Sequence, residues 1–547
     1  MSEATAKPMV ELTIDGKKAT VPDGTNVLEA AKSVGIRVPN FCYHADLTWE
    51  GSCRMCLVSI EGRPKLAPSC CEPVKAGMVV HVGSPEAETA RRAQLEFILL
   101  NHPLDCPICD QAGECKLQDY YVEHGRYESR MPRGLKVHKK KVVDLGERIV
   151  LDKERCVLCS RCVRFCREVS GSHALQFFTR GVTTEIGTEN DGPITGDDYI
   201  GNVVDICPVG ALTAKDFRFR QRVWFLKSAE SVCGHCSTGC NIRVDSKDGT
   251  VYRFVPRRNP EVNKSWICDA GRDSYKLLQG PGRLAGPRLR RAGTHVPASW
   301  EEALDAAQAA IAHGKKAGAN GIAAIASPDV STEALYVFRA FARDVLGTSL
   351  VDYRVDGSHE KTTVMADKIL RHADPHANNT ACAWLGLGQA SVNDILDACE
   401  KEQVKTLYVL RAEFLRGHPE PERVRRALSR VEHVIAHATH DIPELTLASV
   451  VFPDATYLEM DGTFVNYQGR VQRFARAYPP VAEAWPATGV MAQLAKRLGG
   501  AVPAGTADKL FDEMSAAEPA FGGLRWKDLG LLGAQPKSAQ TVGAEER

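Results

Sequence analysis

The chain contains 547 residues, of which 44% are hydrophobic, so it has enough apolar material to build several buried cores. A typical domain size of about 100–200 residues predicts roughly three to five domains. The 69 basic and 68 acidic residues leave a formal net charge of +1, which gives no reason to expect binding to nucleic acid or to an anionic membrane surface. We find no secretory signal pattern and no apolar run of about 18 residues, so we expect neither export nor insertion into a membrane.

The cysteines are concentrated in the first half of the chain. All but four of the 19 cysteines, together with one histidine, fall into four groups. Short C-x2-C spacings without an export signal indicate metal ligation in a reducing compartment rather than disulfide bonds. The cysteines outside the groups are Cys71, Cys166, Cys382 and Cys399.

Residues 1–84 are predicted to form a β-grasp ferredoxin-type domain. Residues 9–21 alternate apolar and polar around an Asp-Gly pair, which indicates a hairpin, and a short helix is expected over 26–34, ended by Gly35. The loop that follows has the spacing C-x10-C-x2-C-x13-C. Its single C-x2-C knuckle favours a [2Fe–2S] cluster over zinc, which usually pairs two such knuckles. The expected ligands are Cys42, Cys53, Cys56 and Cys70, with Cys71 pointing away.

Residues 85–128 are predicted to carry the second group. A helix is expected over 84–100, with Ser84 as its N-cap and a proline at its first position. The spacing H-x3-C-x2-C-x5-C then favours a [4Fe–4S] cluster with one imidazole ligand. A zinc site of three cysteines and one histidine fits the ligand count equally well, and only the neighbouring iron sites favour iron. The expected ligands are His102, Cys106, Cys109 and Cys115.

Residues 145–222 are predicted to form a ferredoxin-like domain. A C-x2-C-x2-C triplet with a distant Cys-Pro pair is typical of a [4Fe–4S] site, and without a second triplet we expect one cluster, leaving Cys166 as a buried spare thiol. The preceding basic stretch, Lys139–Lys141, is expected to be a solvated linker, with contact to an acidic partner as the alternative. The expected ligands are Cys156, Cys159, Cys162 and Cys207.

Residues 226–282 are predicted to hold the fourth group, spaced C-x2-C-x3-C-x27-C. The long return of 27 residues is unlike a compact zinc knuckle and favours a [4Fe–4S] cluster. His235 lies inside the loop, and we expect it not to be a ligand. The expected ligands are Cys233, Cys236, Cys240 and Cys268.

Residues 290–500 are predicted to form an α/β domain. Ser299 and Glu302 form a capping-box pattern, and Ser331 is expected to cap a helix that Gly347 ends. Strand candidates at 322–326, 404–410 and 434–438 alternate with helical stretches, which favours a mostly parallel, doubly wound sheet. Residues 501–547 are expected to be a C-terminal tail that is disordered at its end. The fold class expected for the whole chain is therefore multidomain, α/β and α+β, and no site for NAD or flavin is evident.

The order of the four groups resembles the large iron–sulfur subunit of respiratory complex I, called the G subunit in bacteria and the 75 kDa subunit in mitochondria. The segments that carry this resemblance are FCYHADLTWEGSCRMCLV, HPLDCPICDQAGECKLQD, CVLCSRCVRFC and DICPVGAL. The fourth group and the region after it resemble molybdopterin oxidoreductases through CGHCSTGC, SWEEALDAA and EMDGTFVNYQGRVQRF. The resemblance extends over roughly residues 9–480.

The resemblance implies an electron-transfer subunit of NADH:quinone oxidoreductase, within a translocase complex, that contains one [2Fe–2S] and three [4Fe–4S] clusters and no catalytic residue. Electrons from a flavin subunit would enter at the Cys42 group, pass to the Cys156 group and then to the His102 group, and leave toward quinone. The fourth cluster would lie off this path. The implied partners are the flavin and NADH-binding subunit, a [2Fe–2S] subunit and quinone-proximal iron–sulfur subunits, on the cytoplasmic side of the bacterial inner membrane.

Three other functions compete with this interpretation. One is a subunit of a molybdenum-dependent or NAD-linked formate dehydrogenase, another is the diaphorase module of a soluble hydrogenase, and the third is a scaffold that holds structural zinc. No molybdenum cofactor is expected, because the sequence ends soon after EMDGTF, whereas a molybdopterin fold normally closes its cleft with a further domain. Cys382 could be imagined as a molybdenum ligand, but its apolar surroundings in the sequence indicate a core residue.

Overall fold

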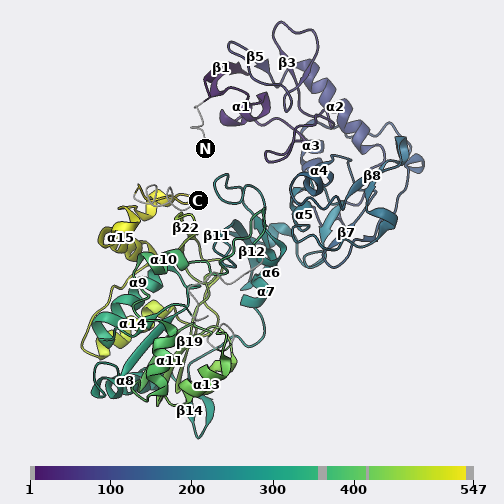
Figure 1. The fold of residues 1–547 in the computed structure, drawn as a ribbon. Coiled ribbons are helices and arrows are strands. Elements are labelled where there is room, and N and C mark those ends of the chain that lie inside the picture. The colour runs from purple at the N-terminus through teal and green to yellow at the C-terminus, as the bar shows by residue number, and fades with distance from the viewer. Residues whose placement is uncertain (1–6, 355–365, 414, 416–417, 538–547) are drawn as a thin grey trace. The chain divides into compact units, whose positions relative to one another are not determined.

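The computed structural model describes residues 7–354, 366–413, 415 and 418–537. The chain divides into two compact units, Met1–Phe225 and Leu226–Arg547 (Figure 1). The predicted fold class is confirmed, since small ferredoxin-type sheets are followed by a large α/β domain. Among the described residues, no helix combines the length and apolar character that crossing a bilayer requires.

The first unit begins with a mixed five-stranded sheet in the order β2-β1-β5-β3-β4. The predicted hairpin is confirmed, and its turn lies at Asp15 and Gly16, which have φ values of +43° and +77°. Apolar side chains of α1 share one core with those of β1 and β2. The elements are β1 (Met9–Ile14), β2 (Lys17–Pro22), α1 (Val27–Ser33), β3 (Leu57–Ile60), β4 (Ala67–Pro68) and β5 (Val79–His81).

Two helices, α2 (Pro85–Leu99) and α3 (Lys116–His124), flank the second cysteine group and pack against each other. The side chain of Ser84 caps α2 as predicted, accepting a hydrogen bond from the Ala87 N–H at 3.2 Å. Arg91 ties α2 to the first sheet, because its buried guanidinium donates to the Val82 carbonyl at 3.1 Å. The helix therefore carries the chain from the first sheet to His102 in a fixed direction.

The rest of the first unit consists of short strands and helices around the third cysteine group. β10, β7 and β6 form an antiparallel sheet, and β8 pairs with β9. The elements are β6 (Val143–Asp144), β7 (Ile149–Leu151), α4 (Arg161–Glu168), β8 (Gln176–Phe178), β9 (Glu185–Gly187), α5 (Asn202–Ile206) and β10 (Leu212–Ala214).

The basic stretch before this region has exposed lysines, as expected of a solvated linker, but these lysines also form ion pairs within the chain that the sequence did not predict. Lys140 forms an ion pair with Asp191 at 2.7 Å, and Lys141 pairs with Asp105 at 2.7 Å. The ammonium group of Lys139 donates to the Thr184 carbonyl. The reason is that carboxylates distant in sequence come together here, so these lysines are used within the chain.

The second unit opens with the antiparallel sheet β11-β12-β13, which carries the fourth cysteine group. Val232, at the end of β11, and Ile242, at the start of β12, are both fully buried, so the loop between them is anchored at each end. The elements are β11 (Lys227–Val232), β12 (Asn241–Lys247), β13 (Thr250–Pro256), α6 (Asp269–Asp273) and α7 (Tyr275–Leu278).

A seven-stranded sheet in the order β15-β14-β20-β19-β18-β16-β17 forms the centre of the α/β domain. The pairs from β20 to β17 are all parallel, and β14 joins β20 in the antiparallel sense. The strands are β14 (Arg288–Arg291), β15 (Thr294–Pro297), β16 (Ile322–Ala326), β17 (Val351–Asp352), β18 (Thr406–Leu410), β19 (His433–Ala438) and β20 (Val450–Pro453). A separate hairpin consists of β21 (Gly462–Val465) and β22 (Val471–Phe474).

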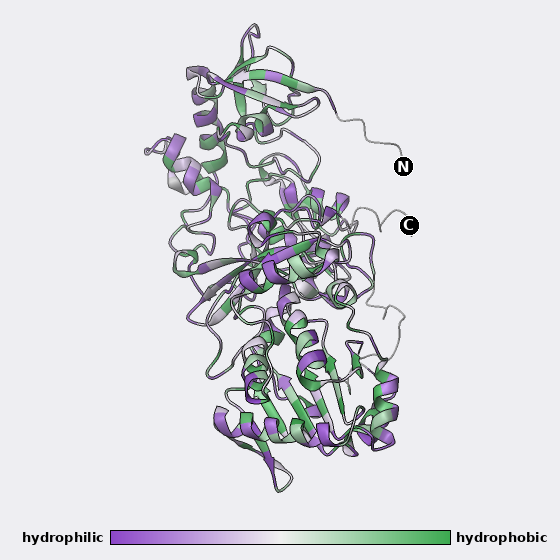
Figure 2. Ribbon diagram, turned by 90° about the vertical axis from the view of Figure 1, so that its left-hand side faces the viewer, coloured by the Kyte–Doolittle hydropathy of each residue, from purple (hydrophilic) through white to green (hydrophobic). Residues whose placement is uncertain are grey.

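Helices cover both faces of this sheet, which confirms the predicted doubly wound arrangement. Alternate residues of the strands belong to two separate apolar cores, as their period of two requires. Ala324 and Tyr408 lie in the first core, whereas Ala323 and Leu407 lie in the second. The helices are α8 (Trp300–Lys316), α9 (Thr332–Ala340), α10 (Asn379–Trp384), α11 (Val392–Glu400), α13 (Pro421–Ser429), α14 (Ala487–Arg497) and α15 (Ala507–Ala517). In Figure 2 the strands of this domain are mostly hydrophobic, while the helices alternate between hydrophilic and hydrophobic segments.

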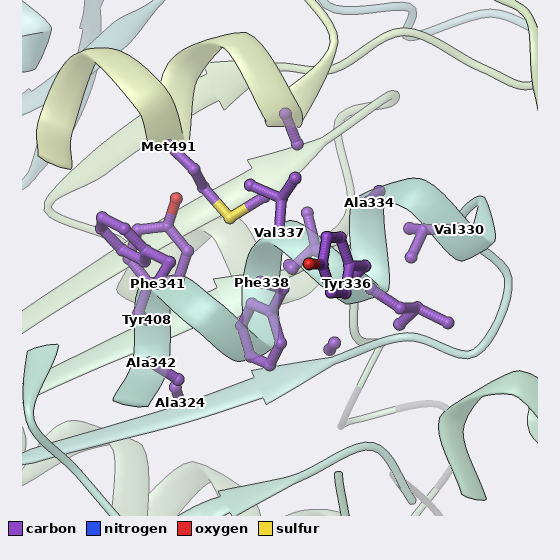
Figure 3. Close-up of a cluster of buried hydrophobic side chains, with 14 of the residues drawn as sticks. Ala324, Val330, Ala334, Tyr336, Val337, Phe338, Phe341, Ala342, Tyr408 and Met491 are labelled. Atoms are coloured by element: carbon purple, nitrogen blue, oxygen red, sulfur yellow. The ribbon is translucent and has the colours of Figure 1, made fainter. Parts of the chain in front are cut away.

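The first of these cores contains several large side chains that are completely buried. Figure 3 shows Phe338 and Phe341 of the α9 region beside Tyr408 of β18 and Met491 of α14. The rings of Phe341 and Tyr408 are 5.1 Å apart. Each fully buried side chain of this kind contributes roughly 1.5–3 kcal/mol by leaving water. The α/β domain therefore has a large apolar core of its own.

The predicted helix ends in this domain are confirmed. Ser299 and Glu302 form a capping box at α8. Ser331 caps α9, which continues as a π-helical turn, Phe341–Leu346, and stops at Gly347 with φ +70°.

The region expected to be a C-terminal tail is folded over much of its described length. Helix α15 places Leu510, Phe511 and Met514 in the first core of the α/β domain. Ala534 forms a bridge to Val471 of β22. The tail expectation missed this helix because it follows a stretch rich in glycine and proline and its stability comes from packing on the α/β core. Most of the segment expected to be disordered, residues 538–547, lies outside the described residues.

Candidate metal centres

Site A consists of the four cysteines expected to hold the [2Fe–2S] cluster, and their sulfur atoms form a connected set. Cys42 is hydrogen-bonded to Cys53 and Cys70, and Cys70 is also hydrogen-bonded to Cys56. These bonds lower the pKa of Cys42, while they and burial raise the pKa of Cys53 and Cys70. The N–H groups of Phe41 and Cys42 both donate to the sulfur of Cys53 at 3.4 Å. Several thiols with backbone N–H groups directed at sulfur are the donor set that an iron–sulfur cluster requires.

The choice between Cys70 and Cys71 follows from their surroundings. Cys70 is completely buried and contacts two other cysteines of site A. The sulfur of Cys71 lies 3.6 Å from that of Cys70 but faces Gly51, where an added Cβ would come within 2.9 Å of it. The geometry therefore favours Cys70 as the fourth member of the set.

Site C consists of the cysteines expected to form the ferredoxin-type cluster. Cys156, Cys159, Cys162 and Cys207 all line one cavity. Burial raises the pKa of Cys156 to about 12 and that of Cys207 to about 11. The Leu158 N–H donates to the Cys156 sulfur at 3.4 Å. Four thiols around one space, two of them buried and two partly buried, fit a [4Fe–4S] cluster.

Cys166 is buried on helix α4, but it does not line the cavity of site C. Burial raises the pKa of its thiol to about 11, which keeps it protonated at neutral pH. Its position agrees with the predicted role of a buried spare thiol.

Site B consists of His102, Cys106, Cys109 and Cys115. Burial raises the pKa of Cys115 to about 11, and the charges of Cys109 and Cys106 add to this shift. The three cysteines therefore lie close together. Burial, with Lys136 and Arg155 nearby, lowers the pKa of His102 to about 4, so the imidazole is neutral and can offer a lone pair to a metal. The charge of Arg155 also acts to lower the pKa of Cys109, so the His102 imidazole and the Cys109 thiol both lie near this arginine.

The loops of sites B and C are joined immediately beside their expected ligands. Asp105 accepts hydrogen bonds from Arg155 at 2.9 and 3.1 Å, and these residues directly precede Cys106 and Cys156. A Cβ added to Gly210 would lie 2.3 Å from the sulfur of Cys109, so the backbone of the Cys207 loop comes very close to this thiol. Only glycine permits that approach without displacing the sulfur. The sequence offered Gly210 no distinguishing signal beyond its place in DICPVGAL.

The loops of sites A and C are also joined beside their expected ligands. Helix α4 begins between Cys159 and Cys162. From this helix, Arg164 donates a hydrogen bond to the carbonyl oxygen of Cys42, and Arg161 donates one to the carbonyl oxygen of Tyr43. Both arginines are buried. The sequence analysis did not single them out, although arginines directly before and two positions after Cys162, the last cysteine of the triplet, were a visible signal.

Site D lies in the second unit, on the loop between β11 and β12 and at the N-cap of α6. Cys233, Cys236, Cys240 and Cys268 are all buried, and the charges of the other three add to the burial that raises the pKa of Cys240. The Gly271 N–H donates to the sulfur of Cys268 at 3.3 Å. This donor set fits a [4Fe–4S] cluster in the same way as site C.

The surroundings of Cys382 agree with its predicted role as a core residue, while the expectation that His235 is not a ligand stays a prediction. Burial lowers the pKa of His235, and the nearby charges that act on it belong to Asp329 and Arg371. Cys382 is completely buried in helix α10 and belongs to the first core of the α/β domain.

Substitution of Cys70 by serine is expected to abolish the [2Fe–2S] signal, because a buried thiol that contacts two other cysteines of site A is lost. Cys71→Ser is the matched control, one position away, and should leave that signal intact. Electron paramagnetic resonance (EPR) of the dithionite-reduced, anaerobically purified chain measures both. Loss of the signal in Cys71→Ser and its survival in Cys70→Ser would reverse the assignment.

Gly210→Ala is expected to disturb site B, because the new methyl group displaces the sulfur of Cys109. Bound iron should then fall by up to about four atoms per chain, the content of one [4Fe–4S] cluster. Gly134→Ala is the control, since a Cβ there has no neighbouring atom within 4 Å. Unchanged iron content and an unchanged [4Fe–4S] spectrum in Gly210→Ala would show that the close approach does not matter.

Five family models match segments of the chain. These are a 2Fe-2S iron–sulfur cluster binding domain over 7–85, an NADH-ubiquinone oxidoreductase-G iron–sulfur binding region over 91–130, an NADH-quinone oxidoreductase subunit 3 ferredoxin-like domain over 146–213, an NDSU1/NuoG-like 4Fe-4S domain over 226–276, and molybdopterin oxidoreductase over 283–382 and 369–497. The chain thus combines 2Fe-2S and 4Fe-4S domains with a molybdopterin-oxidoreductase domain.

Curated relatives match over much of the chain. The G subunit of NADH-quinone oxidoreductase from Streptomyces coelicolor is 43% identical over 350 residues, which cover 63% of this chain and 41% of the relative. The G subunits from Rickettsia felis and Rickettsia bellii are 34% and 32% identical, covering 83% and 90% of this chain and 68% and 72% of the relatives. The chain therefore spans about two fifths of the Streptomyces relative and about 70% of the Rickettsia relatives.

Among solved structures, a chain of an NAD+-reducing [NiFe]-hydrogenase in the H2-reduced state is 29% identical, with a TM-score of 0.35. The match covers 39% of this chain and 91% of that chain. The family assignment depends instead on the Rickettsia relatives, which are more than 30% identical and are covered over more than two thirds of their length. The chain belongs to the family of NADH-quinone oxidoreductase G subunits.

Proposed function

We propose that the chain is the electron-transfer subunit of an NADH:quinone oxidoreductase, relaying electrons from a flavin subunit toward quinone. The observation that supports this most strongly is the direct joining of sites A, B and C within the first unit. Contacts beside the ligands connect A with C and C with B. This adjacency is what a relay requires, and isolated structural zinc sites would have no need of it.

The proposed ligand sets are those expected from the sequence. One [2Fe–2S] cluster is assigned to Cys42, Cys53, Cys56 and Cys70, and three [4Fe–4S] clusters to His102 with Cys106, Cys109 and Cys115, to Cys156, Cys159, Cys162 and Cys207, and to Cys233, Cys236, Cys240 and Cys268. Bound clusters supply one-electron redox chemistry at each site. The burial of the site D thiols and of most site A thiols, the N–H groups directed at sulfur and the neutral imidazole of His102 support these assignments.

The chain's own contribution is to bring the sites together and to shield many of their ligands from water. Cys42 and Cys56 are at most 1% exposed, and Cys159 and Cys162 are 7% exposed. Low exposure and hydrogen bonds to sulfur are the means by which a protein sets the potential of a cluster. We assign no general base or nucleophile, since the proposed role involves transfer of electrons without making or breaking bonds in a substrate.

The contacts also support an order for the three sites. Site C touches both other sites beside their ligands. The contacts between the segments of A and B involve α3 further along the chain, through Tyr120, whose hydroxyl lies 3.2 Å from the Asn40 nitrogen, and through the ion pair of Glu123 with Arg37. We therefore place site C between A and B. Cys106 of site B is exposed to solvent, which supports exit there to a partner subunit.

The proposed partners are the flavin and NADH-binding subunit, a [2Fe–2S] subunit and the quinone-proximal iron–sulfur subunits. The proposed location is peripheral, on the cytoplasmic side of the bacterial inner membrane. Site D lies in the other compact unit, Leu226–Arg547, within the segment that matches the NDSU1/NuoG-like 4Fe-4S domain. We propose that it is a side branch of the main path.

Two serine substitutions in the assembled complex test this proposal. Cys53→Ser removes a ligand of site A and is expected to abolish most NADH:quinone reductase activity, because site A is the proposed point of entry. Cys236→Ser removes a ligand of site D and is expected to leave that activity largely unchanged. Subunit content and flavin content are measured in parallel to verify assembly. Equal loss of activity in both assembled variants would contradict the side-branch assignment, and full activity in Cys53→Ser would contradict the relay itself.

A further inference from the structure

Helix α4 buries two positive charges among the cysteines of the first unit. Arg161 is 5% exposed and Arg164 is 2% exposed. Arginine is rarely buried to this extent without a partner, because removing its charge from water costs several kcal/mol. What these two guanidinium groups contact therefore indicates what they do.

Arg164 is satisfied by oxygen atoms of the chain. Its terminal nitrogens donate to the carbonyl groups of Cys42 and Thr48, and its Nε donates to the Ser160 hydroxyl at 3.0 Å. The carboxylate of Glu50 also lies 3.5 Å from its Nε. Every part of this guanidinium has an acceptor or a counter-charge, so Arg164 acts as a structural tie between α4 and the loop of site A.

Arg161 differs from Arg164 at one atom. Its terminal nitrogens donate to the Ile206 carbonyl at 3.1 Å, to the Asn40 side-chain oxygen at 3.2 Å and to the Tyr43 carbonyl. Its Nε is completely buried and has no hydrogen-bond acceptor among the described residues. A buried N–H without an acceptor costs about 1–3 kcal/mol, so its retention calls for an explanation.

The location of Arg161 supplies that explanation. This residue lines the same cavity as Cys156, Cys159, Cys162 and Cys207. The acceptors that a cluster adds to such a space are sulfur atoms, both sulfides and thiolates, and hydrogen bonds to them are a principal means of tuning its potential. An N–H donor left without an oxygen partner at this wall is suited to that role.

We propose that Arg161 is a positioning and potential-setting residue for site C, whose Nε–H donates a hydrogen bond to a sulfur atom of the cluster held there. This inference depends on the proposed presence of a [4Fe–4S] cluster at site C. The hydrogen bond and the buried positive charge both stabilise the reduced, more negative cluster, which raises its reduction potential. Through Tyr43 and Ile206 the same side chain also holds the loop of site A against the loop that contains Cys207.

The first test detects the hydrogen bond in the unchanged chain. The full chain is prepared with arginine carrying a magnetic nitrogen isotope, reduced with dithionite, and studied by pulsed EPR at the [4Fe–4S] signal that Cys156→Ser abolishes. We expect a hyperfine coupling to an arginine nitrogen at this signal, and its loss in Arg161→Lys. A site C signal without arginine coupling in the unchanged chain would overturn the inference while leaving the proposed function intact. Absence of any site C signal would instead contradict the proposed function.

The second test measures the midpoint potential of the same cluster by EPR-monitored redox titration. Arg161→Gln is expected to shift this potential to a more negative value. Arg167→Gln is the matched control on the same helix, because its side chain is 54% exposed and pairs with Glu168 at 2.7 Å, and it should leave the potential unchanged. Arg161→Lys keeps the charge and is expected to restore only part of the shift. Full restoration by lysine, or an equal shift in Arg167→Gln, would overturn the assigned hydrogen bond.

Discussion

The burial of thiol groups is the constraint on which the first unit depends. Cysteines that are removed from water hold their protons more tightly, and burial raises the pKa of Cys115, Cys156 and Cys207 to about 11–12. A metal cluster reverses this, since it takes thiolates as ligands and releases the protons. The strands of this unit are short, several with only two or three residues, so its elements have limited apolar area of their own. Binding of clusters is therefore expected to supply a substantial part of its folding free energy.

Hydrogen bonds and ion pairs between the ligand loops hold sites A, B and C in fixed positions relative to one another. Arg155 with Asp105 joins C to B, and Arg161 and Arg164 join C to A. Each tie lies within one or two residues of an expected ligand, so a shift in one loop moves the neighbouring site as well. The second unit follows a different principle, because its sheet is enclosed by two apolar cores and does not depend on site D for most of its packing.

Local features of the structure could be predicted well from the sequence. The hairpin at the Asp-Gly pair and the caps at Ser84, Ser299 and Ser331 depend on residues close together in the chain. The parallel sheet around Ile322–Ala326 joins distant strands, and it could be predicted because apolar strands that alternate with helices favour parallel pairing. The spacing of the cysteines was enough to group the expected ligands, because most members of each group lie on one loop. Even the choice of Cys70 over Cys71 agrees with the geometry.

The features that could not be predicted involve pairs of residues far apart in the sequence. The approach of Gly210 to Cys109 and the ion pairs of Lys140 and Lys141 each link segments that spacing rules do not relate. Helix α15 was missed because its stability comes from packing on the α/β core rather than from its own sequence pattern.

The central claim is that four iron–sulfur clusters are bound along this one chain. Iron content and EPR of the anaerobically purified, dithionite-reduced chain test it most directly. The account predicts about 14 irons per chain and separable [2Fe–2S] and [4Fe–4S] signals. About ten irons would mean that one [4Fe–4S] site is empty. Zinc in place of iron, with a colourless chain and no paramagnetic cluster, would contradict the account.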